Sequence, residues 1–209
     1  MKEYLVPARD AEAEFTEKRS RFIGHIFHTE TEEEALARLK EVRDRNWNAT
    51  HNVYAYIIRD GATRFSDDGE PGGTAGMPVL QVLQREEIFN VTCVVTRYFG
   101  GILLGAGGLV RAYAHSAKIA VDAAGLAMKR VWSAVYMPCP YSWFDRIKLE
   151  VDAFGGMIRK NDFGADVELE LLLPEEQTQP FLDHVLDLTA GTVEGMITGQ
   201  EYRAFPVKP

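Results

Sequence analysis

The segment Arg97-Tyr98-Phe99-Gly100-Gly101-Ile102-Leu103-Leu104-Gly105 joins a predicted strand to a predicted helix. Residues 89–97 alternate apolar and polar side chains as a half-buried strand does, and the small residues that follow predict a helix over residues 107–124. Arg97 stands where the apolar series would place another core residue, and the glycines after it let the backbone approach another group closely. A charge and a bare loop at a strand end are typical of ligand contacts, so the segment indicates a site.

The bulk composition is that of a soluble globular protein. The chain has 209 residues, enough for one large domain or two small ones, of which 46% are hydrophobic and 26% charged. No apolar run approaches the ~20 residues of a membrane span, and the N-terminus lacks the apolar core of a signal peptide. The two cysteines cannot form a disulfide framework, and a buried, reduced thiol is expected for Cys93. We therefore expect a cytoplasmic protein.

Charge is spread unevenly along the chain. Residues 1–133 hold 17 Lys and Arg against 18 Asp and Glu, and residues 134–209 hold 6 against 13. The net charges of the two parts are therefore −1 and −7, within a total of −8. Neutralised phosphates supply most of the affinity of a free-standing nucleic-acid binder. Non-specific DNA or RNA binding is thus disfavoured, although a local basic patch is compatible with this balance.

The periodicity predicts an α+β protein with two domains, residues 1–133 and 134–209, divided near Pro138-Cys139-Pro140. In the first domain Thr31 precedes three glutamates, and the basic residues Arg43 and Arg45 stand at the end of the segment. This pattern predicts a capped helix over residues 32–45. Further helices are predicted at 77–86 and 107–124, strands at 21–29, 52–58 and 89–97, a partner strand near 13–17, and a loop over 59–76.

The second domain has the pattern strand, helix, strand, strand, helix, strand. A unit of helix, glycine stop and Met-Ile strand occurs twice, at residues 154–158 and 191–197. Two such halves predict a ferredoxin-like split βαβ sandwich whose helices cover one face of the sheet. The expected strands are 134–137, 157–161, 166–172 and 193–205, and the expected helices are 141–154 and 175–188.

The acidic loop Ser66-Asp67-Asp68-Gly69-Glu70-Pro71-Gly72-Gly73-Thr74-Ala75-Gly76 is a first candidate site. Asp67, Asp68 and Glu70 could hold Mg²⁺, which prefers oxygen ligands. The glycines and the start of the next helix offer backbone N–H groups to an anion. Turns also collect these residues for structural reasons, so a solvated turn with Thr74 capping the helix is the alternative.

The glycine loop that follows Arg97 is a second candidate site. The glycine-rich helix start at Gly105 could cradle a phosphate, with Arg97 and Arg111 adding positive charge. The loop lacks the Lys-Ser/Thr of a P-loop and does not match G-x-G-x-x-G, so it meets no nucleotide motif. Close packing of the helix on the sheet is the alternative.

The histidines do not predict a metal site. His25 and His28 lie three apart in a strand and therefore point to opposite faces. His51 opens a strand and could meet the acidic loop, and His115 follows Arg111 by one helical turn on the same face. The chain has no H-E-x-x-H, C-x-x-C or G-x-S-x-G, which disfavours a zinc site and a hydrolase.

Tyrosines predict a third candidate site on the sheet. Tyr54 and Tyr56 share one side of their strand, and Thr96 and Tyr98 share one side of another. If these sides align, they form a flat platform that could stack bases or anchor a protein. The alternative is the wet face of a half-covered sheet, where Tyr and Thr are good strand formers.

Together, the segment 97–105 and the loop 66–76 resemble the IMPACT/YigZ family, and the acidic second domain is similar to the second module of the bacterial YigZ branch. The likeness covers residues 18–207. It implies a first domain with the ribosomal-protein-like βαβ fold also seen in the fourth domain of elongation factor G, and a second domain like the fifth domain of that factor. The family signature maps onto Asp67, Asp68, Gly69, Glu70, Thr74, Arg97, Gly100, Gly101 and Gly105.

The resemblance also implies a role in translation and no accepted catalytic residue. Eukaryotic members restrain phosphorylation of an initiation factor by binding an activator of a stress kinase, partly through a further N-terminal domain that this sequence does not contain. We therefore expect a non-enzymatic, translation-associated module that docks on RNA, a ribosome or a translation factor and needs no cofactor. The expected binding residues are Arg97, Tyr98, Gly100, Gly101, Gly105, Arg111, His51 and Thr74. The alternative is a Mg²⁺-dependent enzyme or phosphate binder that uses the acidic and glycine loops.

Overall fold

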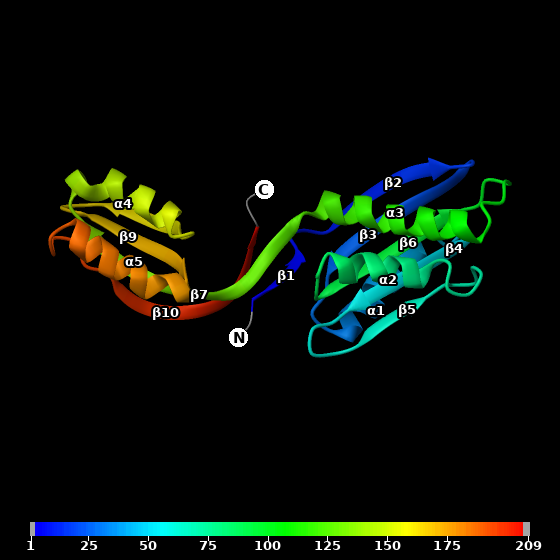
Figure 1. Ribbon diagram of the computed structural model, residues 1–209, viewed down its shortest axis with the longest axis horizontal. Coiled ribbons are helices and arrows are strands. Elements are labelled where there is room, and N and C mark those ends of the chain that lie inside the picture. The colour runs from blue at the N-terminus through cyan, green and yellow to red at the C-terminus, as the bar shows by residue number, and fades with distance from the viewer. Residues whose placement is uncertain (1–2, 207–209) are drawn as a thin grey trace. The chain divides into compact units, whose positions relative to one another are not determined.

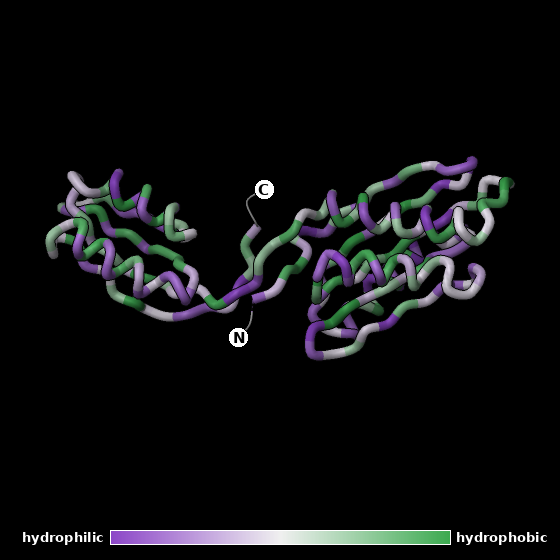
Figure 2. Tube along the Cα trace, in the orientation of Figure 1, coloured by the Kyte–Doolittle hydropathy of each residue, from purple (hydrophilic) through white to green (hydrophobic). Residues whose placement is uncertain are grey.

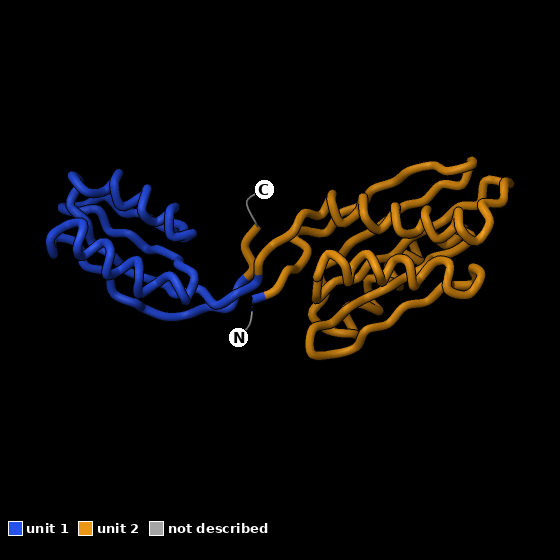
Figure 3. The backbone as a smooth tube through the Cα atoms, in the orientation of Figure 1, with its two compact units in different colours: residues 1–3, 129–203 blue, residues 4–128, 204–209 orange. Residues whose placement is uncertain are grey.

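The computed structural model describes residues 3–206, which form two compact units (Figure 3). The N-terminal unit consists of residues 4–128 with the chain from residue 204, and the C-terminal unit of residues 129–203 with Glu3. Strands β7 (Leu126–Cys139) and β10 (Met196–Pro206) each run from one unit into the other. The predicted domain boundary between residues 133 and 134 falls within β7, so the point at which one domain ends stays a prediction.

The N-terminal unit is built on a five-stranded sheet with the order β2-β3-β6-β4-β5, in which every neighbouring pair is antiparallel. The predicted pairing of the segment near residues 13–17 with the strand after it is confirmed. The short strands β5 and β1 were not predicted; β5 lies within the expected loop 59–76. The strands of this sheet are β2 (Ala11–Glu17), β3 (Ser20–His28), β4 (His51–Ile57), β5 (Thr63–Ser66) and β6 (Val91–Tyr98), whereas β1 (Tyr4–Pro7) belongs to the second sheet.

Helices cover both faces of this sheet (Figure 1). The helices α2 (Gly76–Arg85) and α3 (Ala106–Ala124) pack on one face over the larger core. The helix α1 (Glu32–Arg45) covers the other face and has the predicted bounds. Its predicted cap is also confirmed, because Thr31 Oγ1 accepts the N–H of Glu34 at 3.2 Å.

The strand β6 is buried on both faces, so the prediction of a half-buried strand was wrong. Cys93 and Val95 belong to the core under α2 and α3. Val94, on the opposite face, packs with Leu39 and Val42 of α1. Alternation along one strand shows only that its two faces differ, and it does not reveal that a distant helix covers the more polar face. Burial raises the pKa of Cys93 to about 12, so its thiol stays protonated.

Most of a second five-stranded sheet lies in the C-terminal unit; its order is β1-β7-β9-β8, and β10 also pairs with β7. This order interleaves two βαβ halves, since β9 of the second half lies between β7 and β8 of the first. Leu169 and Leu171 of β9 point into a core with Phe181 of α5, while the acids between them are exposed. The chain was predicted to divide near Pro138, but no break in the strand occurs there, because Pro138 pairs with Glu168 within β7. The remaining elements are α4 (Tyr141–Ala153), β8 (Met157–Phe163), β9 (Val167–Pro174) and α5 (Glu175–Leu188).

Candidate functional site

Arg97 ends β6 with its guanidinium inside the protein. Its Nη1 donates to Glu70 Oε1 at 2.5 Å, and only 6% of the Arg97 side chain and 4% of the Glu70 side chain are exposed. Nη2 donates to Ser20 Oγ at 3.4 Å, and the ring centroids of Phe22 and Phe99 lie 5.5 Å from Cζ. The side chain of Arg97, which was expected to be a binding residue, is therefore buried and paired with a carboxylate.

Two further side chains surround the carboxylate of Glu70. Tyr113 of α3 donates its hydroxyl to the same Oε1 at 2.6 Å, and His51 Nε2 lies 3.8 Å from that oxygen. Burial and the hydrogen bond to Glu70 raise the pKa of Tyr113, which keeps the phenol protonated. Because the carboxylate of Glu70 bonds both Arg97 and Tyr113, this buried cluster holds the acidic loop against the sheet.

Asp67 caps α2 from outside the helix. Its Oδ1 accepts the N–H groups of Ala75 and Gly76 at 3.0 and 2.8 Å, which satisfies donors that every helix start leaves free. Thr74 does not cap the helix as predicted: it is buried, and its hydroxyl donates to the carbonyl of Pro71 at 2.6 Å. The capping role therefore belongs to Asp67, and Thr74 stabilises the turn before the helix.

Asp68 ties the acidic loop to β4 and α1. Its Oδ2 accepts the N–H of Asn52 at 2.7 Å, and its Oδ1 accepts from Arg43 Nη2 at 2.8 Å. His51 Nδ1 donates to the Asp68 carbonyl at 2.7 Å, which confirms that His51 meets this loop. The three carboxylates of the loop thus serve three different structural contacts. Within residues 3–206 no group of three His, Cys, Asp or Glu side chains is placed to hold a metal ion.

The glycine loop combines a packing glycine with exposed backbone. A Cβ on Gly100 would lie 2.0 Å from the carbonyl carbon of Arg19, so only glycine fits there. Gly101 and Gly105 adopt φ of 84° and 73°, which favours glycine, and no atom lies within 4 Å of their would-be Cβ positions. Gly100 therefore positions the loop, while the backbone at Gly101 and Gly105 is open to a partner.

The predicted tyrosine platform is covered by α1. Tyr54 and Tyr56 stack on each other with ring centroids 6.0 Å apart, and Tyr56 is only 3% exposed. Its hydroxyl donates to Glu32 of α1, and burial together with that carboxylate raises the pKa of Tyr56. Tyr98 donates to Asn46 Oδ1 at 2.9 Å. These rings cannot stack bases, because a helix occupies the space above them.

Four loops at the end of the N-terminal unit where α3 begins are fastened together (Figure 1). The Gly100 N–H donates to Ser20 Oγ at 3.2 Å, and the Phe99 N–H donates to Thr50 Oγ1 at 3.0 Å. The Arg97–Glu70 pair joins the acidic loop to the same assembly. We term this surface the loop end; it comprises residues 17–20, 46–50, 67–75 and 99–105.

The loop end exposes large apolar side chains. Trp47 is 83% exposed, Leu103 81%, Phe99 46% and Ile102 41%. Figure 2 shows the glycine loop as a hydrophobic stretch beside the hydrophilic β2–β3 turn. Contiguous exposed apolar residues mark interaction surfaces. Trp47 was not predicted as a site residue, although a lone tryptophan within the polar segment 43–48 indicates an exposed aromatic side chain.

A cavity of about 250 Å³ lies between the β2–β3 hairpin and α3. Arg111 and His115 both line it, which confirms that they share a helix face. Lys18 and Arg111 have no ion-pair or hydrogen-bond partner among the described residues. Phe15 and Lys18 were not predicted as site residues, because only the folding of the β2–β3 hairpin against α3 brings them to this cavity. The lining consists of Phe15, Glu17, Lys18, Leu104, Gly108, Arg111, Ala112 and His115.

Comparison with known proteins defines the class of protein. The family model of the Impact N-terminal domain matches residues 18–121, and a domain of unknown function, DUF1949, matches residues 138–192. The protein thus combines an Impact-type domain, which contains the loop end from residue 18 onward, with a second family domain. The IMPACT family member YvyE of Bacillus subtilis is 36% identical over 90% of this chain and 88% of its own length. The chain belongs to the IMPACT family, as the resemblance predicted.

Other relatives agree with this assignment. The IMPACT family member YigZ of Escherichia coli is 34% identical over 93% of this chain and 97% of its own. Protein IMPACT of Oryctolagus cuniculus is 36% identical over 48% of this chain and 33% of its own. A crystal structure described as a hypothetical protein aligns with a TM-score of 0.60 at 33% identity, covering 95% of this chain and 98% of that chain. Among the described helices, none has the length and apolar character to cross a membrane.

Proposed function

We propose that this protein is a non-enzymatic, translation-associated module that docks on ribosomal particles through its loop end. The proposal rests on one observation: loops that are fastened together expose Trp47, Phe99 and Leu103, and one of them carries Lys18, which has no partner within residues 3–206. Aromatic and leucine side chains bury apolar area on contact, and aromatic rings also stack bases. Free cations neutralise phosphates. Membership of the IMPACT family supports the association with translation, which the resemblance implied.

The loop end replaces the binding residues that the sequence indicated. Arg97 and the tyrosines have partners inside the fold, so their side chains are not offered to a ribosomal partner. The exposed backbone at Gly101 and Gly105 and the side chain of Arg111 remain part of the proposed contact. His51 and Thr74 contribute indirectly, because both hold the acidic loop in place.

The charge distribution supports a docking role for the N-terminal part of the chain. Residues 134–209 carry a net charge of −7, which phosphate would repel, whereas residues 1–133 are nearly neutral at −1. Local cations can then select a docking position without general affinity for nucleic acid. The likeness of the two domains to the fourth and fifth domains of elongation factor G, including the ferredoxin-like form of the second, belongs to this proposal and is an argument from analogy.

The Mg²⁺-dependent enzyme has weaker support. It requires carboxylates that are free to bind a hard cation. Asp67, Asp68 and Glu70 each accept protein N–H or O–H donors instead. Calorimetric titration with Mg²⁺ and nucleotides tests this alternative, and binding heat that disappears in Asp68→Asn would revive it.

Cosedimentation with purified ribosomal particles tests the proposed function. The wild-type protein is expected to pellet with the particles at low salt and to be released as salt rises. Trp47→Ser is expected to weaken binding about 30-fold, equivalent to the ~2 kcal/mol of an aromatic hot spot. Because Trp47 is 83% exposed, the substitution leaves the fold intact.

Leu149→Ser is the matched control for this experiment. Leu149 is 66% exposed on α4 of the C-terminal unit, so it removes a similar apolar side chain far from the loop end in sequence. Binding that Leu149→Ser and Trp47→Ser weaken equally would remove the loop end as the docking surface. A wild-type protein that never pellets with the particles would refute the function itself.

A further inference from the structure

We propose that the cavity between the β2–β3 hairpin and α3 holds one nucleotide of an RNA strand. Lys18 and Arg111 would bind its phosphodiester, and the base would lie against the apolar lining and His115. This inference rests on the proposed function and adds the chemical group that the docking surface recognises. It is carried by the cavity's size, its unpartnered charges and its aromatic lining.

The size of the cavity limits the ligand. Drug-sized ligands occupy pockets of roughly 300–1,000 Å³. A cavity of about 250 Å³ lies just below that range, which matches a ligand portion about the size of a single nucleotide. The remainder of a longer strand would continue across the exposed side chains of the loop end.

The charges of the cavity call for an anion. Several exposed arginines of this unit are paired; Arg21, for example, contacts Glu14, and Arg43 contacts Asp68. Lys18 and Arg111 line one cavity and have no such partner within the described chain. The guanidinium of Arg111 folds back along its own helix, with Nη1 3.9 Å from the would-be Cβ of Gly107. It therefore lies beside the start of α3, where the helix dipole also favours an anion.

The charge balance favours a phosphodiester over a free phosphate monoester. The two cations Lys18 and Arg111 and the carboxylate of Glu17 together contribute one net positive formal charge to the lining. A phosphodiester carries one negative charge, whereas a phosphate monoester carries about −1.5 to −2 near neutral pH. The carboxylate of Glu17 would repel the second charge of a monoester, so a nucleotide within a strand fits better than a free mononucleotide.

An aromatic pair in the cavity can contact the base. The rings of Phe15 and His115 meet edge to face with centroids 4.7 Å apart, and Phe15 also stacks on Phe22 at 5.2 Å. The ring of Phe22 therefore supports one face of Phe15, while His115 is exposed to solvent. Stacking on aromatic rings tolerates every base, so we expect little sequence preference.

The test measures binding of a short, fluorescently labelled single-stranded RNA of mixed sequence to the full chain by anisotropy, over a range of salt concentrations. Arg111→Gln and Lys18→Gln are each expected to lower the slope of log affinity against log salt by about 0.7. At 0.1 M salt the same relation gives an affinity loss of about fivefold for each substitution.

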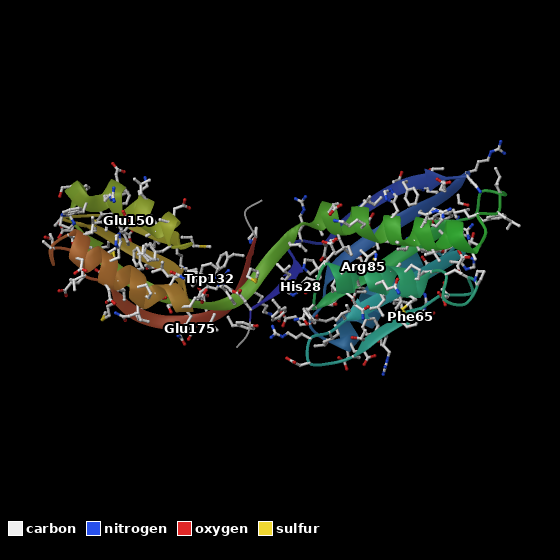
Figure 4. The ribbon with its side chains drawn as sticks, viewed as in Figure 1. His28, Phe65, Arg85, Trp132, Glu150 and Glu175 are labelled. Carbon is white, nitrogen blue, oxygen red and sulfur yellow. The ribbon has the colours of Figure 1, made fainter. Side chains whose placement is uncertain are left out.

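Arg85→Gln is the matched control. Arg85 is exposed at the end of α2, is labelled in Figure 4, lies outside the cavity lining, and has no partner in the described part of the chain. This substitution is expected to leave the salt slope unchanged. If all three substitutions change affinity and slope alike, the cavity is not the nucleotide site.

A second arm separates the strand from free nucleotide. Calorimetric titration with adenosine monophosphate is expected to show weaker binding than the RNA. Tighter binding of adenosine monophosphate than of RNA would overturn the assignment to a strand. Cosedimentation that depends on Trp47 would survive either failure, so the inference and the proposed function can fail separately.

Discussion

Arg97 and Arg111 flank the same glycine loop but have opposite environments. The guanidinium of Arg97 is buried and paired with Glu70, whereas Arg111 is exposed and has no partner among residues 3–206. Arg97 continues the core-facing series of β6, and Arg111 lies on the outer side of α3. Arg97, which stands in the sequence motif, therefore holds the loops in shape, whereas Arg111, which lies outside it, is available to contact a partner.

The largest expected effect comes from breaking the buried pair. Glu70→Gln leaves the charge of Arg97 buried without a carboxylate, and we expect the free energy of unfolding to fall by about 3 kcal/mol. Chemical denaturation followed by circular dichroism measures this loss. Adding Arg97→Met removes the unpaired charge and keeps an acceptor for Tyr113, so the double variant is expected to recover most of the stability. A double variant less stable than Glu70→Gln would show that the pair's charge is not the cause.

A smaller effect is expected from the helix cap in the same loop. Asp67→Ala removes the acceptor for the N–H groups of Ala75 and Gly76, which we expect to cost about 1–2 kcal/mol of unfolding free energy. Thermal denaturation provides the measurement. Glu41→Ala is the control, because its ion pair with Arg38 lies at the surface and contributes little. Equal losses in the two variants would argue against Asp67 as the cap.

The smallest effect on stability is expected at the other arginine. Arg111 is exposed and forms no ion pair with any described residue, so we expect the unfolding free energy of Arg111→Gln to remain within about 0.5 kcal/mol of wild type. The same denaturation experiment measures it beside Glu70→Gln. A loss as large as that of Glu70→Gln would erase the distinction between the two arginines.

Much of the fold could be predicted because its signals are local. The bounds of α1 and α5 agree with the predicted ranges 32–45 and 175–188, since a capping threonine, glutamates and a glycine stop lie next to those helices in sequence. The short strand β5 gave no such signal: it spans only Thr63–Ser66 and is mostly exposed. The segment length alone could not separate it from a loop.

The candidate site was harder to predict because its contacts are long-range. The acidic loop and the glycine loop were each selected from their composition, but the pair that joins them, Arg97 and Glu70, is 27 residues apart in the chain. Alternation in β4 and β6 also predicted a polar face without showing that α1 covers it. Lys18 lines the cavity only because the β2–β3 hairpin lies against α3, and no local pattern encodes that contact.

The backbone of Gly100 lies against the backbone of Arg19, and this contact fixes the loops of the loop end while their outward side chains stay free to vary. No methyl group fits between Gly100 and the main chain of Arg19. The β2–β3 hairpin and the glycine loop are therefore in direct backbone contact at this point. The side chains that point outward from them take no part in that junction. Natural or engineered exchange of Lys18 or Leu103 could therefore redirect the protein to a different partner without rebuilding the scaffold that presents them.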